Sequence, residues 1–260
     1  MTDPGSIADA APERLERAGA PALAYRRSPG TGPWTVFLGG FMSDMTGTKA
    51  TALEAFCRER GRAFLRFDYR GHGASEGAFV DGTIGLWTED ALATIDALTD
   101  GPVVLVGSSM GGWIMLNAAL ERPGRVAGLI GIAAAPDFTE RMMNEEFDAP
   151  TRAALMRDGL VRVPSDYDDE PYAITRALIE DGRRHLLLGA PIPIHCPVRL
   201  IQGMADTAVP WRTALAIAER LESDDVEVTL VKSADHRLSD PPDLDRLCRT
   251  LEALWARVES

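Results

Sequence analysis

The sequence predicts an α/β protein built on a mostly parallel central sheet with helices on both faces. Short segments that are apolar throughout alternate with amphipathic helical segments, as expected when each strand is buried on both faces of a sheet. The length of 260 residues suits one large α/β domain. Glycine-containing polar segments directly follow several of these strands, and such sheets bind ligands beyond the carboxyl ends of their strands. We therefore expect a single functional site at that edge.

The first half of the chain begins with a loose lead-in over residues 1–20 and then alternates strands and helices. A Pro- and Gly-rich turn separates the first two strands, and Gly61 ends the first helix. In order, the pattern predicts strands over 22–27 (an edge strand) and 34–38, a helix over 49–60, a strand over 63–67, a helix over 88–98 and a strand over 103–106.

The second half contains an interruption. After a predicted strand over 126–133, residues 137–190 are rich in charge and methionine and are broken by prolines, so we expect short helices at best. The alternation then resumes with predicted strands over 198–201 and 226–231 and helices over 211–221 and 244–258. We therefore predict a core formed by residues 21–136 and 191–260, with a cap (lid) inserted over residues 137–190.

The composition of the chain indicates which binding partners and which cellular location to expect. A formal net charge of −12 and a pI near 4.8 argue against nucleic acid or an anionic membrane as a partner. Cys57, Cys196 and Cys248 lack C-x-x-C spacing, so we expect neither a disulfide framework nor a zinc site. Residues 1–17 are acidic and lack an apolar run, and no stretch approaches the ~18 apolar residues of a membrane span. We expect a cytoplasmic protein without stable membrane insertion; its oligomeric state is left open.

Ser109 is the predicted nucleophile. It lies in Gly107-Ser108-Ser109-Met110-Gly111, between an apolar strand and a helix that begins near Trp113. A serine on a sharp strand-to-helix turn requires small residues two positions before and after it, and Gly107 and Gly111 meet this need. The N-terminus of the following helix presents free N–H groups toward developing negative charge.

His236 is the predicted general base, because a serine nucleophile needs a neighbouring group that takes its proton. It directly follows the last predicted strand and so lies at the carboxyl edge of the sheet. The other three histidines fit this role less well. His72 lies in a glycine loop before Ser109, His185 lies in the predicted cap, and His195 lies at the amino end of a strand.

Asp206 is the predicted carboxylate that orients His236. It lies in the loop after the strand 198–201, from which it can reach the loop after the last strand. Asp235 is the nearest alternative, but adjacent residues in a tight loop rarely orient one another. Asp137, after the strand 126–133, is a weaker alternative.

Two backbone N–H groups are the predicted oxyanion hole, which stabilises the charge that develops when a serine attacks a carbonyl. One belongs to Met110, directly after the nucleophile. The other belongs to Phe41, in the loop that begins with Gly39 and Gly40 after a strand. The alternative is that these glycines form a simple turn.

Dispersed motifs along the chain carry a resemblance to a known family. The segments concerned are Gly47-Thr48-Lys49, Phe67-Asp68-Tyr69, Gly107 to Gly112, Pro191-Ile192-Pro193, Cys196-Pro197, Gly203-Met204-x-Asp206, Val209-Pro210-Trp211 and Asp235-His236-Arg237. With these segments the chain resembles the α/β-hydrolase superfamily and, within it, the mitochondrial palmitoyl-protein thioesterases that also act as mycophenolic acid acyl-glucuronide esterases. The chain order serine, aspartate, histidine is that of this superfamily. Gly39-Gly40 stands where many members have His-Gly.

The resemblance implies a serine hydrolase that cleaves carboxylic esters or acyl thioesters of a small-molecule or acylated substrate through an acyl-enzyme, without a metal or organic cofactor. An acyltransferase or perhydrolase on the same residues is the alternative among enzymes. A ligand-binding protein on the same scaffold is the alternative outside them. In the predicted cap, Met142, Met143, Phe147, Leu155 and Met156 either line an acyl channel or form a small core of their own.

Overall fold

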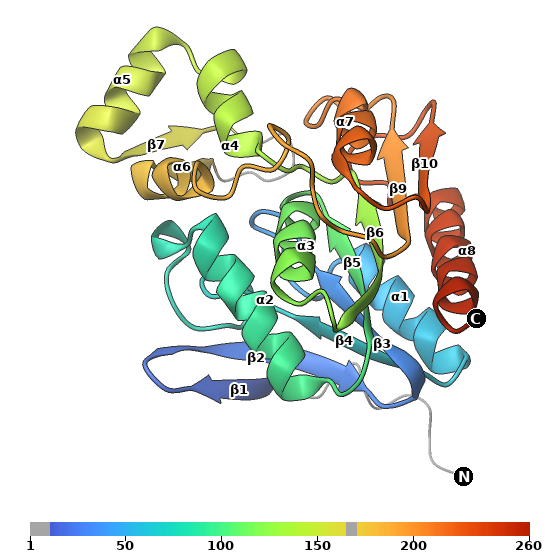
Figure 1. Ribbon diagram of the computed structural model, residues 1–260. Helices are drawn as coiled ribbons and strands as arrows, with labels where there is room; N and C mark the ends of the chain where they lie inside the picture. Colours follow the sequence, from blue (N-terminus) through green and yellow to red (C-terminus); the bar gives the residue numbers. More distant parts are fainter. Residues whose placement is uncertain (1–10, 165–170) are drawn as a thin grey trace.

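A computed structural model describes residues 11–164 and 171–260 of the chain. Within these residues the central sheet has eight strands in the order β1-β2-β4-β3-β5-β6-β9-β10 (Figure 1). The strands are β1 (Glu13–Arg17), β2 (Ala20–Ser28), β3 (Thr31–Leu38), β4 (Arg62–Phe67), β5 (Val103–Ser108), β6 (Val126–Ile132), β9 (Val198–Gly203) and β10 (Val226–Val231).

The sheet is parallel from β4 to β10, because each neighbouring pair in that part runs in the same direction. β1 and β2 run antiparallel to their neighbours at one end. Every residue of β5 is buried, as a parallel strand covered on both faces requires. The predicted mostly parallel α/β sheet is confirmed.

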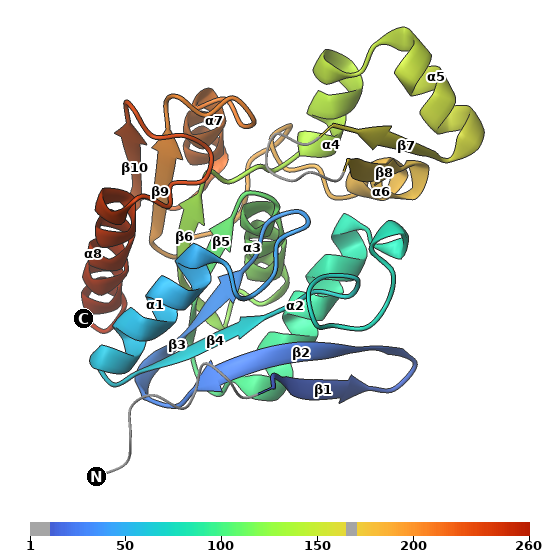
Figure 2. The same ribbon diagram turned by 180° about the vertical axis from the view of Figure 1, so that it is seen from behind.

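Helices cover both faces of the sheet. One face carries α1 (Thr48–Glu59) and α8 (Pro241–Val258), which lie in front in Figure 2. The other face carries α2 (Ile84–Leu98), α3 (Met110–Glu121) and α7 (Arg212–Arg220). Each face has its own apolar core: Leu53 of α1 and Leu251 of α8 belong to one cluster of buried residues, whereas Trp87 of α2 and Trp113 of α3 belong to the other. Burial of these apolar stripes holds the helices on the sheet.

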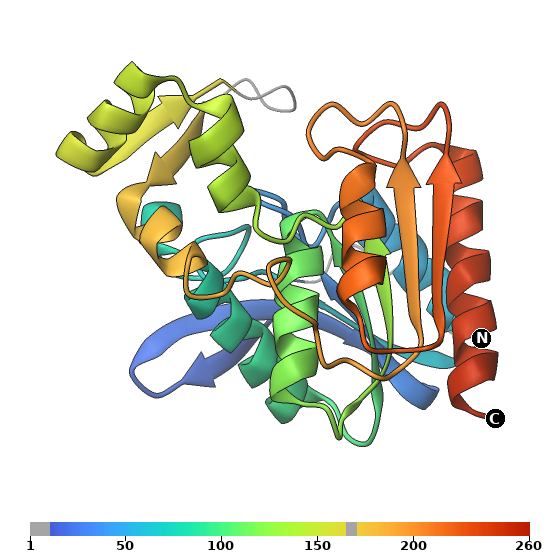
Figure 3. The same ribbon diagram turned by 45° about the horizontal axis from the view of Figure 1, so that its top comes forward.

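A separate group of elements lies between β6 and β9, on the side toward which the parallel strands point (Figure 3). Short helices are expected over 137–190, and the described part of that segment contains four; an antiparallel pair of four-residue strands was not predicted. The elements are α4 (Phe138–Arg141), the π-helical turn η2 (Met142–Glu146), α5 (Ala149–Asp158), β7 (Leu160–Val163), β8 (Tyr172–Thr175) and α6 (Arg176–Gly182).

The N-terminal region differs from the sequence-based expectation. β1 occupies part of the predicted loose lead-in, and β2 lies inside the sheet because β1 covers its outer edge. A buried ion pair holds β1 in place: Arg17 Nη1 donates over 2.6 Å to Asp90 of α2, whose side chain is fully buried. Arg17 and Asp90 are 73 residues apart, so no local pattern could indicate this contact. Residues 1–10 of the lead-in lie outside the described residues.

Candidate active site

The turn between β5 and α3 places Ser109 at the carboxyl end of the sheet. Ser109 has a backbone φ of 54°, in the left-handed region that residues other than glycine rarely adopt. The flanking glycines permit this turn. A Cβ on Gly111 would stand 2.1 Å from the Leu38 carbonyl oxygen, and a Cβ on Gly107 would stand 2.4 Å from the Gly111 carbonyl oxygen. Larger residues at either position would therefore displace the turn.

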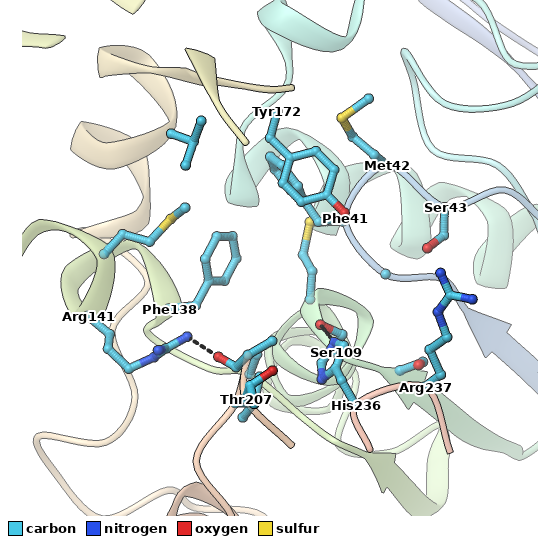
Figure 4. Close-up of a pocket in the computed structure, with 18 of the residues that line it drawn as sticks. Phe41, Met42, Ser43, Ser109, Phe138, Arg141, Tyr172, Thr207, His236 and Arg237 are labelled. Carbon is cyan, nitrogen blue, oxygen red and sulfur yellow. Dashed lines mark hydrogen bonds between the residues drawn. The ribbon is translucent and has the colours of Figure 1, made fainter. Parts of the chain in front are cut away.

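Ser109, His236 and Asp206 form a hydrogen-bonded chain. Figure 4 shows Ser109 and His236 side by side at the pocket. His236 Nδ1 lies 2.8 Å from Asp206 Oδ2, and His236 Nε2 lies 3.1 Å from Ser109 Oγ. An ionised carboxylate only accepts hydrogen bonds, so Nδ1 donates to it and Nε2 accepts from the serine hydroxyl. This arrangement leaves Nε2 able to take a proton from Ser109.

Asp206 is held as a carboxylate. Burial by itself would raise the pKa of Asp206, but donors outweigh this effect: His236, the Val209 N–H and Gln202 Nε2 together hold its pKa below the usual value. The Ala208 and Val209 N–H groups each donate to Oδ1 over 2.8 Å. The site therefore keeps a negative charge next to His236 at neutral pH, where it can stabilise an imidazolium.

Gly203, the last residue of β9, allows the histidine loop (residues 232–240, between β10 and α8) to approach β9 closely. A Cβ at Gly203 would stand 2.3 Å from the Ala234 carbonyl oxygen and 2.6 Å from the Asp235 carbonyl oxygen. Lys49 of α1 holds the same loop from another side, because its Nζ donates to the Arg237 carbonyl oxygen. Lys49 lies in the motif Gly47-Thr48-Lys49, but its place in the sequence does not indicate this contact, which joins residues 188 positions apart.

The alternative carboxylates serve other contacts. Asp235 accepts the N–H groups of Arg237 and Leu238 within its own loop. Asp137 accepts the N–H groups of Leu187 and Leu188, and so ties together the start and the end of the segment between β6 and β9.

The other histidines are also accounted for. His72 is buried among aromatic rings, and burial lowers its pKa to about 4. His185 lies near Asp181, and its carbonyl oxygen accepts a hydrogen bond from Trp113. His195 is exposed and lies 3.7 Å from Glu222.

The predicted oxyanion loop passes next to the serine. A Cβ on Gly40 would stand 3.4 Å from the Ser109 Cβ, so the strand that ends at Leu38 delivers Phe41 to the edge of the same pocket. The Phe41 ring contacts four other rings edge-on, two from the core (Phe79 and Trp87) and two from the segment 137–190 (Phe138 and Tyr172). These contacts fix the loop through its side chain.

A pocket of about 480 Å³ opens above Ser109 and His236. Figure 4 shows aromatic side chains on one side of Ser109, and Ser43 with Arg237 on another. The apolar lining includes Phe41, Met110, Phe138, Met142, Val163 and Tyr172, and the charged lining consists of Lys49, Arg141, Glu146 and Arg237. Within the part of the chain that the structure describes, no group of three or more His, Cys, Asp or Glu side chains is placed to hold a metal ion.

Comparison with known proteins identifies the family. A family model described as "Serine aminopeptidase, S33" matches residues 36–167. The palmitoyl-protein thioesterase ABHD10, mitochondrial, of Bos taurus is 43% identical over 95% of this chain and 80% of that protein. The Homo sapiens protein of the same name is 42% identical with the same coverage. The chain belongs to the ABHD10 family of α/β-hydrolases.

Solved structures agree with this membership. The mouse α/β-hydrolase domain-containing protein 10 matches with a TM-score of 0.89 and 41% identity, covering 96% of this chain and all of that one. A putative hydrolase of Agrobacterium vitis S4 matches with the same TM-score and 42% identity, covering 94% of this chain and 98% of that one. The predicted α/β-hydrolase fold is thus confirmed, and the chain is a serine hydrolase.

The predicted cytoplasmic location is wrong, because the ABHD10 relatives from cattle, human and mouse are mitochondrial proteins. The prediction used only the composition of residues 1–17. A targeting segment is not part of the packed fold, so proteins with this fold can differ in location. Among the described residues, no helix is both long and apolar enough to span a membrane.

Proposed function

We propose that the protein hydrolyses acyl thioesters, and carboxylic esters of the same acyl groups, with Ser109 as nucleophile, His236 as general base and Asp206 as the orienting carboxylate. The observation that carries this proposal is the hydrogen-bonded chain from Ser109 through His236 to Asp206, which opens into the pocket. Membership of the ABHD10 family supports the thioester as the bond that is cleaved.

The reaction proceeds in two halves. His236 Nε2 takes the Ser109 proton as Oγ attacks the acyl carbonyl, and the imidazolium returns that proton to the departing thiol or alcohol. The Phe41 and Met110 N–H groups donate to the oxyanion of each tetrahedral intermediate. Water then attacks the acyl-enzyme, with His236 again taking a proton, and releases the carboxylic acid while Ser109 regains its hydrogen.

The segment 137–190 acts as a cap that receives the acyl chain. Its Phe138, Met142, Val163 and Tyr172 form much of the apolar side of the pocket. Apolar surface around a bound alkyl chain stabilises the complex by roughly 25 cal/mol per Å² removed from water. The acyl group of an acylated cysteine in a protein substrate fits this side, with the polypeptide outside the pocket; a small acylated molecule fits it equally.

The test is hydrolysis of a palmitoyl-cysteine peptide thioester and of a short p-nitrophenyl ester by the wild-type protein, Ser109→Ala and Ser108→Ala. Ser108 precedes the nucleophile in the same turn and makes a matched control. Ser109→Ala is expected to lose several orders of magnitude in kcat on both substrates, while Ser108→Ala stays active. An active Ser109→Ala would overturn the mechanism. Turnover of the short ester alone would keep the mechanism and overturn the thioester substrate.

Whether water is the acceptor is tested separately. The products are analysed in the presence of a competing alcohol or hydrogen peroxide. Hydrolysis is expected to dominate, with the free acid as the main product. A dominant transferred ester or peracid would overturn hydrolysis in favour of acyl transfer or perhydrolysis on the same residues.

A further inference from the structure

Gln202 contacts the carboxylate on which His236 depends. It lies in β9, four residues before Asp206, and its side chain is fully buried. Gln202 Nε2 donates over 2.8 Å to Asp206 Oδ2, the same oxygen that accepts the hydrogen bond from His236 Nδ1. We propose that Gln202 is a positioning residue for the reaction, which holds the Asp206 carboxylate in the plane that His236 requires. This inference rests on the proposed function.

The orientation of the Gln202 amide follows from its surroundings. Three oxygens surround Nε2: Asp206 Oδ2 at 2.8 Å, the Val209 carbonyl oxygen at 3.2 Å and the Gly203 carbonyl oxygen at 3.3 Å. Rotating the amide by half a turn would place Oε1 against these three acceptors, which is repulsive. The Gln202 side chain therefore serves as a donor. Its buried Oε1 has no hydrogen-bond partner among the described residues, so this orientation of the amide is unfavourable at Oε1 and is kept for the contacts that Nε2 makes.

The donors around Asp206 divide between its two oxygens. Oδ1 accepts the Ala208 and Val209 N–H groups, which belong to the loop of Asp206 itself. Oδ2 accepts from His236 and Gln202. The two backbone donors fix one oxygen in place but leave the carboxylate free to turn about it. The Gln202 side chain extends from β9 of the sheet and holds the second oxygen, Oδ2. Without the Gln202 amide, Oδ2 can move away from His236.

The first test removes the donor and keeps the side-chain length. Gln202→Met is expected to lower kcat about tenfold with little change in KM, because a hydrogen bond to a charged group is lost while the pocket is untouched. In the proton NMR spectrum, the low-field resonance of the His236 Nδ1 proton, which is hydrogen-bonded to Asp206, is expected to shift upfield or broaden. Gln202→Asn, whose shorter amide cannot reach Oδ2, is expected to act in the same direction and covers the case in which Gln202→Met does not fold.

Thr94→Val is the matched control. Thr94 is a fully buried polar residue of α2 whose hydroxyl finds no partner among the described residues. Its replacement tests the effect of making a buried polar position apolar away from the site. Thr94→Val is expected to keep the kinetics and the low-field resonance of the wild-type protein. Gln202 variants with the same behaviour as Thr94→Val would overturn the proposal.

The second test asks whether Gln202 acts through Asp206. In an Asp206→Asn background, Gln202→Met is expected to cause no further loss of kcat, because the carboxylate that Gln202 positions is already absent. A second tenfold loss in that background would show that Gln202 acts on the site independently, and would overturn the proposal. Wild-type activity in Asp206→Asn itself would instead overturn the proposed function, so the two failures are distinguishable.

Discussion

Asp206 Oδ2 and His236 Nδ1 lie 2.8 Å apart, although the two residues are 30 positions apart in the chain. Asp206 follows β9 and His236 follows β10, and these two strands are parallel neighbours in the sheet. The contact therefore follows from the pairing of the strands, with Gly203 allowing the histidine loop to approach β9. Parallel pairing brings the ends of consecutive strands to one edge, and this edge is where the side chains of the proposed mechanism meet.

Replacing this carboxylate is expected to disable the histidine. Asp206→Asn keeps the size of the side chain but removes the charge that holds His236 in the tautomer that accepts the serine proton. We expect kcat to fall by roughly 10⁴-fold on ester and thioester substrates. Steady-state kinetics with Asp235→Asn as control measure this effect. Asp235 accepts only N–H groups of its own loop in the described contacts, so its variant is expected to lose less than tenfold. Equal losses in the two variants would contradict the assignment of Asp206.

Met142 and Met156 belong to the same segment but have different surroundings. Met142 lines the pocket, whereas Met156 on α5 is 42% exposed. Met142→Gln is expected to raise KM for long acyl chains by about tenfold and to leave KM for acetyl esters nearly unchanged, because it removes apolar contact from the wall that receives the chain. Met156→Gln is the matched control, with no expected change. A similar KM increase for acetyl and long-chain substrates would contradict an acyl-binding role for Met142.

His72 links stability to pH. Burial lowers its pKa from 6.5 to about 4. Between these values the unfolded chain binds a proton at this position and the native protein does not, so stability falls as pH falls from 6.5 to 4. His72→Phe removes the titrating group, and a phenyl ring suits the edge-on contacts with Tyr69, Phe79 and Trp87.

The measurement is the free energy of unfolding by urea at pH 7.5 and at pH 4.5. The wild-type protein is expected to lose about 2 kcal/mol more than His72→Phe between these two conditions. Parallel losses in the two proteins would show that His72 does not carry this part of the acid sensitivity. The comparison cancels the contributions of other groups, since both proteins share them.

Local patterns predicted the regular elements well. The strand expected over 226–231 has the bounds of β10, and the helix expected over 49–60 differs from α1 by one residue at each end. Such patterns indicate which side of a segment turns inward: half-buried residues alternate with exposed ones at the start of β10, and α1 buries Leu53 and Cys57 on one side. The start of α2 lies four residues before the predicted helix, because Thr83 caps its N-terminus by accepting the Leu86 N–H.

Contacts between distant segments could not be predicted in the same way. β1 depends on the ion pair of Arg17 with Asp90, and the Phe41 loop depends on rings that come from four other segments. The five apolar residues singled out in 137–190 divide among three environments. Met142 lines the pocket, Met156 is exposed, and Met143, Phe147 and Leu155 are buried in the core.

The sequence by itself determined the serine turn and the order of the loops that follow the strands. A strand, two spaced glycines and a helix specify that turn through local backbone sterics, whatever surrounds them. Only the tertiary structure decided which carboxylate accepts the hydrogen bond from His236, and that Gln202 and Lys49 hold the two loops. These contacts depend on which strands pair and on which side chains meet at the edge of the sheet. The number of residues between two positions in the sequence does not give their distance across a sheet.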